Sequence, residues 1–128
     1  MGESLSTISD AELEVLKALW KHGPATVREI NAQLRPLKRR WAYNTVLTLL
    51  TRLREKGYVA SEKRGVAHRF ASVVSREELL RRKLTDVADR VCNGMASPLV
   101  HALVEGQQFS ADEIAQFRKL FDELQQAE

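Results

Sequence analysis

Cysteine is nearly absent from this chain, since Cys92 is the only one in 128 residues. A single thiol forms no disulfide within the chain and supplies no thiolate cluster for a structural metal. An apolar run of about eighteen residues, the length of a membrane-spanning helix, is also missing. Residues 1–9 lack the basic and apolar regions of a secretory signal. We therefore expect a cytoplasmic protein without membrane insertion.

Residue groupings typical of catalytic or metal sites are missing as well. His22, His68 and His101 lie far apart, with no His-x3-His spacing, Ser/His/Asp set or glycine-rich phosphate loop beside them. A histidine such as His101 on an apolar helix is more often a packing residue than a ligand. Cys92 is more often a core or interface residue than a sensor thiol. We predict no enzymatic activity, no cofactor and no metal site.

Acidic residues are scarce in the middle of the chain. From Arg35 to Arg69 ten Lys or Arg residues face only Glu55 and Glu62, which gives this window a net charge of +8. The remainder holds ten basic and fifteen acidic residues, a net charge of −5. A basic centre between acidic flanks indicates a surface that binds a polyanion.

Four boxes of Ser or Thr followed three residues later by Glu predict where helices begin. In such a box the hydroxyl accepts from a free backbone N–H and the glutamate accepts from the N–H of the cap residue. The boxes are Ser9 with Glu12, Thr26 with Glu29, Ser75 with Glu78, and Ser110 with Glu113. The chain should therefore be mainly α-helical.

Residues 1–74 have the element order of a winged helix-turn-helix domain. Helical periodicity predicts three helices, from Asp10 to about Lys21, Val27 to about Leu34, and Ala42 to about Lys56. Tyr58–Lys63 and Val66–Val73 have strand-like composition and meet at Arg64-Gly65, which predicts a β-hairpin. Lys63, Arg64 and Arg69 give that hairpin a basic tip.

The third helix has the polar face that reading a DNA groove requires. Val46, Leu49, Leu50 and Leu53 form its apolar stripe. Helical geometry places the short polar side chains of Asn44, Thr48 and Thr51 on the opposite side, with Thr45 and Arg52 beside them. Near a helix N-terminus such side chains can reach base edges in the major groove.

Basic residues around that helix would bind phosphates. They are Lys38, Arg39 and Arg40 before the helix and Lys63 and Arg64 on the hairpin. We expect Trp41 to be buried and Tyr43 to lie at the groove edge. Taken alone, the polar face also fits a helix that only faces solvent. The functional alternative is a winged helix that acts as a protein–protein interaction module.

Residues 75–128 read as a helical dimerisation region. Three helices are expected, from Arg76 to about Asn93, after Pro98, and after Ser110. Their apolar stripes include Leu84, Val87, Val91, Leu103, Phe117, Leu120, Phe121 and Leu124. So short a region buries such stripes poorly by itself, and a two-fold homodimer would cover them. The alternative is that these helices fold back on the winged domain.

The chain resembles the penicillinase-repressor family, also called the BlaI/MecI/CopY family. The matching segments are "ISDAELEVLKALW" from Ile8, "TVREINAQL" from Thr26, "AYNTVLTLLTRLREKGYV" from Ala42 and "HRFASVVSREEL" from His68. The resemblance extends from Ile8 to about Leu124. It implies a dimeric transcriptional repressor that binds a palindromic double-stranded DNA operator. By the same resemblance, base contacts fall at Tyr43, Asn44, Thr45, Thr48 and Arg52, and wing contacts near Arg64 and Gly65.

Two branches of that family differ in how repression is relieved. In the antibiotic-responsive branch the resemblance implies proteolysis of the dimerisation helices, at an Asn-Phe bond, after a membrane sensor metalloprotease is triggered. The equivalent region here reads His101-Ala102-Leu103, so that cleavage site does not transfer. The copper-responsive branch has a cysteine-rich C-terminus, and a chain with only Cys92 does not fit that design.

Overall fold

The chain packs into two units. The computed structural model describes residues 7–37 and 41–127, with only the backbone of Arg64. The first unit ends at Leu84 and the second begins at Thr85, so the division falls inside a helix. The domain boundary expected after Val74 stays a prediction.

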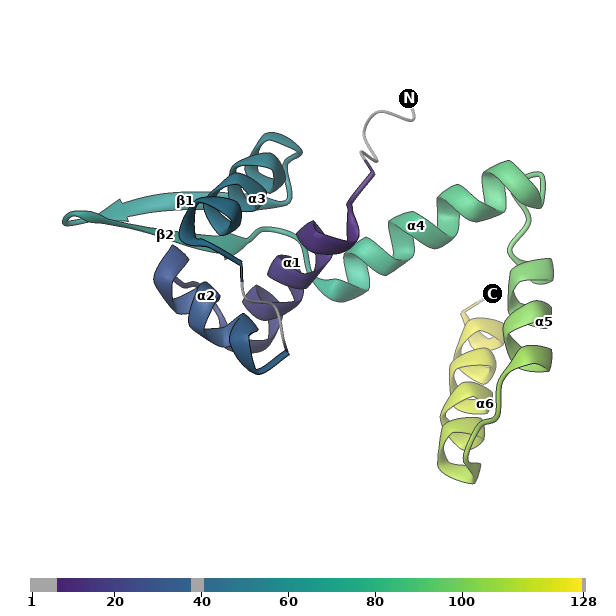
Figure 1. Ribbon diagram of the computed structural model, residues 1–128. Coiled ribbons are helices and arrows are strands. Elements are labelled where there is room, and N and C mark those ends of the chain that lie inside the picture. The colour runs from purple at the N-terminus through teal and green to yellow at the C-terminus, as the bar shows by residue number, and fades with distance from the viewer. Residues whose placement is uncertain (1–6, 38–40, 128) are drawn as a thin grey trace. The chain divides into compact units, whose positions relative to one another are not determined.

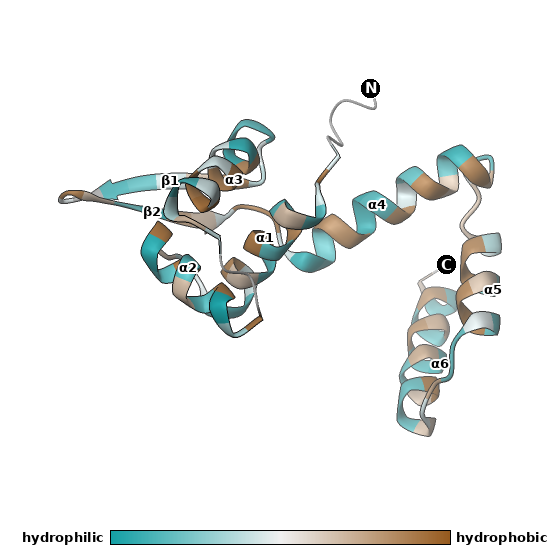
Figure 2. Cartoon of the chain, in the orientation of Figure 1, coloured by the Kyte–Doolittle hydropathy of each residue, from teal (hydrophilic) through white to brown (hydrophobic). Residues whose placement is uncertain are grey.

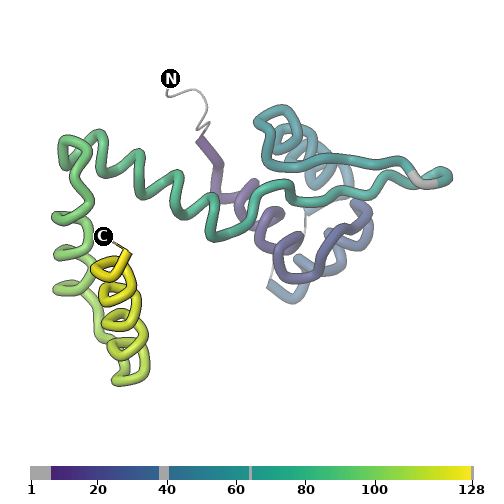
Figure 3. Tube along the Cα trace, turned by 180° about the vertical axis from the view of Figure 1, so that it is seen from behind, coloured from purple at the N-terminus to yellow at the C-terminus, as the bar shows by residue number. Residues whose placement is uncertain are grey.

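The first unit is the mainly α winged helix-turn-helix that the sequence predicts. Its three helices lie beside a two-stranded antiparallel hairpin whose far end extends past them (Figures 1 and 3). The elements are α1 (Asp10–His22), α2 (Val27–Leu34), the short 3-10 helix η2 (Arg35–Leu37), α3 (Tyr43–Glu55), β1 (Val59–Arg64) and β2 (Ala67–Ser72). The helix bounds agree with the predicted ones to within a residue or so.

Capping boxes begin three helices, as predicted. At Ser9, Thr26 and Ser110 the hydroxyl accepts from the N–H three residues on, and the glutamate there accepts from the N–H of the cap residue. At the fourth position Ser75 Oγ accepts from the Glu78 N–H at 2.9 Å. The Glu78 carboxylate accepts from the guanidinium groups of Arg81 and Arg82.

The hydrophobic core lies among α1, α2, α3 and the root of the hairpin. Fully buried side chains come from all three helices, namely Val15, Leu16, Ile30, Leu34, Val46, Leu50 and Leu53. Tyr58 and Phe70 extend the core to the hairpin. Trp41 is half-buried against this core, so the expectation that it would be buried is only partly met.

The hairpin turn is one residue later than predicted. The register runs from Val59 opposite Ser72 to Arg64 opposite Ala67, so Gly65 and Val66 form the two-residue loop. Gly65 has φ of 63°, which is the value that a type II′ turn requires at its first central position. The predicted joint at Arg64-Gly65 was therefore wrong, because pairing continues through Arg64.

Arg69 does not belong to the basic tip, which corrects a second prediction. It pairs with Glu62 in the middle of the hairpin. Its guanidinium donates to the Pro24 carbonyl at 2.9 Å and lies 3.8 Å from the Glu29 carboxylate. The backbone N–H of Thr26 and the charge of Arg69 lower the pKa of Glu29. Arg69 therefore ties the hairpin to the start of α2.

A buried ion pair connects the first and third helices. Glu12 is only 2% exposed, and Lys56 Nζ lies 2.7 Å from its carboxylate. The same ammonium donates to the Thr7 carbonyl at 2.6 Å. Burial raises the pKa of Glu12, but the hydrogen bonds from Lys56 and Ser9 and the charge of Lys56 leave it below its usual value.

The second unit is helical. α4 (Arg76–Val91) continues into it across the division, and α5 (Ser97–Gly106) and α6 (Ala111–Gln126) follow. The rings of Phe109 and Phe117 meet edge to face with centroids 5.2 Å apart, which joins the α5–α6 loop to α6. Among the described residues no helix is both long and apolar enough to cross a membrane.

We expect Glu12→Gln to lower the free energy of unfolding by about 2–3 kcal/mol near neutral pH, because it removes charged hydrogen bonds to a buried group. The folded-state pKa of Glu12 is lowered, so its carboxylate stabilises the fold above the unfolded pKa of roughly 4 and this contribution is lost as pH falls through the folded pKa. Denaturant titrations from about pH 7 to pH 3 should show a shallower acid loss in the variant.

Glu14→Gln is the matched control for that measurement. Glu14 lies 4.0 Å from Lys17 in a one-turn pair on the partly exposed side of the same helix. Its removal should cost less than about 0.5 kcal/mol, because exposed ion pairs contribute little. Equal losses in the two variants would contradict the role assigned to Glu12.

Candidate nucleic-acid interface

The outer face of α3 presents short polar side chains to solvent. Because Val46, Leu49, Leu50 and Leu53 are buried, the opposite side of the helix faces outward. The predicted base-contacting residues are all exposed there or beside it, namely Tyr43, Asn44, Thr45, Thr48 and Arg52. Within the described part of the chain, the side chains of Asn44, Thr45 and Thr48 have no hydrogen-bond partner. Their donors and acceptors are therefore available to a ligand.

Contacts at both ends of α3 hold the helix in place. Before its N-terminus, Asn31 Nδ2 on α2 donates to the Trp41 carbonyl at 2.9 Å. Near its C-terminus, Arg54 Nη1 donates to Ser61 Oγ on β1 at 2.9 Å. Lys56, the C-cap residue of α3, pairs with Glu12 on α1. The outer face is thus fixed relative to α1, α2 and the hairpin.

Thr51 differs from the other polar residues of α3. It is half-buried, and its Oγ1 donates to the Leu47 carbonyl one turn earlier at 2.9 Å. A hydroxyl that donates within its own helix can still accept a hydrogen bond. Thr51 therefore contributes an acceptor at the edge of the polar face rather than a free donor.

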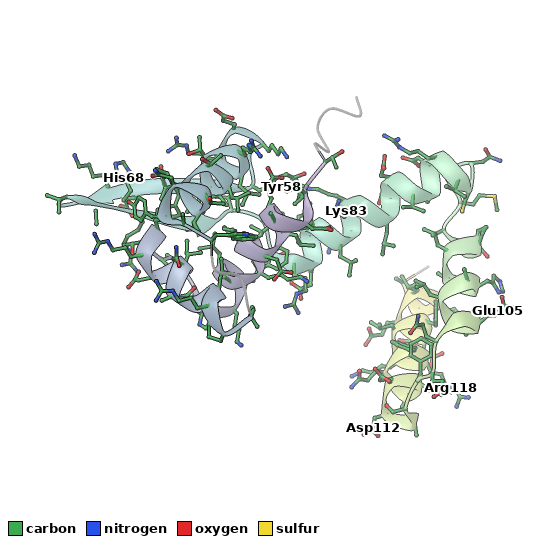
Figure 4. All side chains as sticks on the ribbon, viewed as in Figure 1. Tyr58, His68, Lys83, Glu105, Asp112 and Arg118 are labelled. Atoms are coloured by element: carbon green, nitrogen blue, oxygen red, sulfur yellow. The ribbon has the colours of Figure 1, made fainter. Side chains whose placement is uncertain are left out.

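A groove separates α3 from the hairpin. It is lined by the first turn of α2, one side of α3 and the outer part of β2, with the residues Thr26, Val27, Arg28, Tyr43, Leu47, Thr51, Arg54, Val66, Ala67, His68 and Phe70. Figure 4 places His68 on the outer part of the hairpin and Tyr58 at its root. Two arginines from different elements, Arg28 on α2 and Arg54 on α3, line the groove, which suits an anionic backbone.

Of the residues that line this groove, the sequence prediction assigned only Tyr43 and Thr51 to a ligand-facing surface, and it missed Arg28, Leu47, Arg54 and His68 among others. One sequence signal was available for two of them. Leu47 lies four residues after Tyr43 and seven residues before Arg54, so these three side chains share one side of α3. Leu47 is 36% exposed there, which a purely core-facing leucine would not be. The part played by Arg28 and His68 depends on where the hairpin packs and has no sequence signal.

The basic residues predicted to bind phosphate are only partly placed. Lys63 and Gly65 are exposed at the end of the hairpin, beside Val66, which is 99% exposed. The side chain of Arg64 and the residues Lys38, Arg39 and Arg40 lie outside the described part of the chain. Their contacts with phosphate stay predictions.

No metal site emerges from the described residues. Within that part of the chain, no group of three His, Cys, Asp or Glu side chains could hold a metal ion. Cys92 is half-buried just after α4.

The predicted dimerisation residues form exposed apolar faces. Leu84, Val87 and Val91 are exposed along α4. In the second unit, α5 and α6 line an apolar groove. Hydrophobic positions recur along both helices (Figure 2). Five predicted residues border this groove, namely Leu103, Phe117, Leu120, Phe121 and Leu124. Leu120 is 59% exposed, so by itself this unit does not cover its own apolar surface.

Comparison with known proteins places this chain among repressors. The family profile described as penicillinase repressor matches residues 8–123. The penicillinase repressor of Bacillus licheniformis is 29% identical over 121 residues, which cover 94% of this chain and 94% of that protein. The transcriptional regulator BlaI of Mycobacterium tuberculosis is 32% identical over 124 residues, which cover 94% of this chain and 87% of that protein.

The first unit also resembles a solved structure. The solution structure of the DNA-binding domain of the repressor BlaI has a TM-score of 0.51 and 32% sequence identity with this chain, and covers 58% of this chain and 89% of that domain. The similarity in sequence and in fold therefore includes the elements that carry the candidate interface.

We expect Asn44→Ala to reduce discrimination between a preferred duplex and a mismatched one by about 1–3 kcal/mol, because asparagine can form paired hydrogen bonds with adenine. Arg28→Ala should weaken binding to preferred and random duplexes by the same factor, because phosphates carry no sequence information. Fluorescence anisotropy with both duplexes measures these effects. Arg90→Gln, at an exposed ion pair on α4, is the control. An equal loss on both duplexes for Asn44→Ala would refute the base contact.

Proposed function

Because this chain belongs to the penicillinase repressor family, which consists of transcriptional repressors and not of enzymes, it is a DNA-binding transcriptional repressor, and we propose that it acts as a homodimer on a palindromic operator. In this proposal α3 lies in the major groove and the hairpin contacts the neighbouring backbone.

The observation that carries the proposal is the outer face of α3. The side chains of Asn44, Thr45 and Thr48 on this face are short, polar and without partners among the described residues, and the helix that carries them is held at both ends. A helix can approach base edges closely only when the side chains between its backbone and the groove floor are short. Asn44, Thr45 and Thr48 meet that requirement at the N-terminal end of α3, where recognition helices make their base contacts.

The groove between α3 and the hairpin supports the same arrangement. A recognition helix in the major groove leaves the sugar–phosphate backbone beside it, on the side where the hairpin lies. Arg28 and Arg54 on the groove walls would pair with phosphate oxygens there. The hydrogen bond from Arg54 to Ser61 orients its guanidinium before any ligand arrives. The exposed Lys63 at the hairpin end would add a further backbone contact.

The exposed apolar faces favour a second copy of this chain as partner. A groove bordered by Leu103, Phe117 and Leu120 is left uncovered by its own unit. Self-association around a two-fold axis covers the same face on both copies at once. A two-fold dimer presents two α3 helices in opposite directions, which matches the inverted half-sites of a palindrome.

Relief of repression by proteolysis would act on the same helices. A cut within the dimerisation region separates the two winged-helix units without altering either one. Each unit alone binds DNA more weakly than the two units linked in a dimer. The stretch His101-Ala102-Leu103 lies within α5 and has no Asn-Phe bond. If a membrane sensor metalloprotease acts on this protein, it therefore cuts a different bond.

Titration of a palindromic duplex across salt concentrations tests DNA binding directly. The duplex is first recovered by selection from a random pool, and a scrambled duplex of the same composition is the control. The logarithm of the binding constant should fall linearly with the logarithm of salt concentration, by about 0.9 per phosphate neutralised. A flat response, with no sequence recovered by selection, would favour the rival role as a protein-interaction module.

We expect Leu120→Glu to convert the dimer to a monomer, because it places a charge in the apolar groove of each copy. Light scattering measures the mass. Ala115→Glu is the matched control, since it introduces the same charge on the exposed opposite side of α6 and should leave the dimer intact. An unchanged mass for Leu120→Glu would exclude this groove from the dimer interface.

A further inference from the structure

The indole of Trp20 lies where the hairpin ends and α4 begins. Its Nε1 donates to the Val74 carbonyl at 2.8 Å and to Ser72 Oγ at 3.1 Å. The hydroxyl of Ser72 also donates to the same Val74 carbonyl. One side chain on α1 thereby holds the segment that leaves β2.

The first turns of α4 are attached to the same place. The guanidinium of Arg76, the first residue of α4, lies over the Trp20 ring at 5.8 Å from its centroid. Val74 and Leu79 are both buried in the core of the first unit. Only three residues separate Ser72 from Arg76, and none of them is glycine or proline. Segments that let domains move independently are usually longer and rich in Gly, Pro or polar residues.

We propose that Trp20 and Arg76 form a joint that fixes the direction in which α4 leaves the winged-helix unit, and that this joint sets the half-site spacing that a dimer accepts. The inference rests on the proposed function, because spacing has meaning only for a dimer on two half-sites. Both residues are positioning residues, since neither lies on the outer face of α3 or lines its groove.

The physical reason is the geometry of B-DNA. One inserted base pair moves a half-site by about 3.4 Å along the axis and rotates it by roughly a tenth of a turn. If α4 leaves each winged-helix unit in a fixed direction, the dimer can no longer contact both half-sites at once after such an insertion. A dimer with loose joints can reach the displaced half-site and keeps most of its affinity for the altered palindrome. It binds the correctly spaced palindrome less tightly, because the effective concentration of its second DNA-binding unit at the second half-site is lower.

Two variants loosen the joint in different ways. Trp20→Phe keeps an aromatic ring but loses the N–H donor, and Arg76→Gln removes the charge over the ring. Arg90→Gln makes the same substitution on the same helix at an ion pair with Asp86, away from the joint, and is the matched control. Thermal unfolding of each variant establishes that it is folded before binding is measured.

Binding is measured on three duplexes: one half-site, the selected palindrome, and that palindrome with one base pair inserted at its centre. We expect the insertion to weaken wild-type and Arg90→Gln protein about 100-fold, and to weaken Trp20→Phe and Arg76→Gln less than about 10-fold. Half-site affinity should stay within about twofold throughout. The inference is overturned if the insertion weakens both joint variants as much as it weakens the wild-type protein. It is also overturned if the joint variants lose as much affinity for the single half-site as they lose for the palindrome.

A second measurement needs no DNA and separates this inference from the proposed function. Nitroxide labels are placed at Lys63→Cys, near the end of each hairpin, in a Cys92→Ser background that leaves no other thiol. Double electron–electron resonance should give a narrow distribution of label-to-label distances in the parent protein and a broad distribution in the Trp20→Phe variant. Equal widths overturn the joint. If the unlabelled wild-type protein binds no duplex while the labelled Trp20→Phe protein shows this broadening, the proposed function alone is refuted.

Discussion

The rotation of α3 about its own axis is the constraint on which the interface depends. Burial of Val46, Leu49, Leu50 and Leu53 leaves one orientation in which the apolar stripe is removed from water. Turning the helix to bring Asn44 and Thr48 inward would bury several polar groups without partners, at a cost of about 1–3 kcal/mol each. The same burial that stabilises the fold therefore determines which side chains are offered to a ligand.

The buried pair of Glu12 and Lys56 adds a second constraint, on position rather than rotation. The carboxylate caps α1 and holds the end of α3 at once, so any movement of α3 along α1 would separate an ion pair that is largely shielded from water. Together with the contacts of Asn31 and Arg54, it makes the recognition surface a property of the whole winged-helix unit.

The local features of the fold were predictable from the sequence, whereas the tertiary ones were not. Helix starts followed from the Ser/Thr-x-x-Glu boxes, and the outer face of α3 followed from its apolar stripe, because both depend on residues a few positions apart. The groove depends on where the hairpin packs, and Arg69 shows why that matters. Its partners Pro24 and Glu29 lie about forty residues away in sequence, so nothing near Arg69 distinguished it from a basic tip residue.

The same distant contacts change how the basic window should be read. Lys56 and Arg69 are paired with Glu12 and Glu29, two carboxylates that lie outside residues 35–69. Counting these two acids lowers the net charge associated with the window from +8 to +6. Part of the positive charge thus holds the fold together, and the charge offered to DNA is smaller than the sequence count suggests.

The division of the chain inside α4 has a consequence for how such regulators can be rearranged. A fragment that stopped at the end of the hairpin would lose Leu79 from its core and Arg76 from the ring of Trp20. A functional graft of the winged-helix unit onto another dimerisation region must therefore carry α4 at least through Leu79. Gene fusions that exchange winged-helix units among regulators of this design would be tolerated when the crossover lies within α4. They would be destabilised when the crossover lies in the loop before α4.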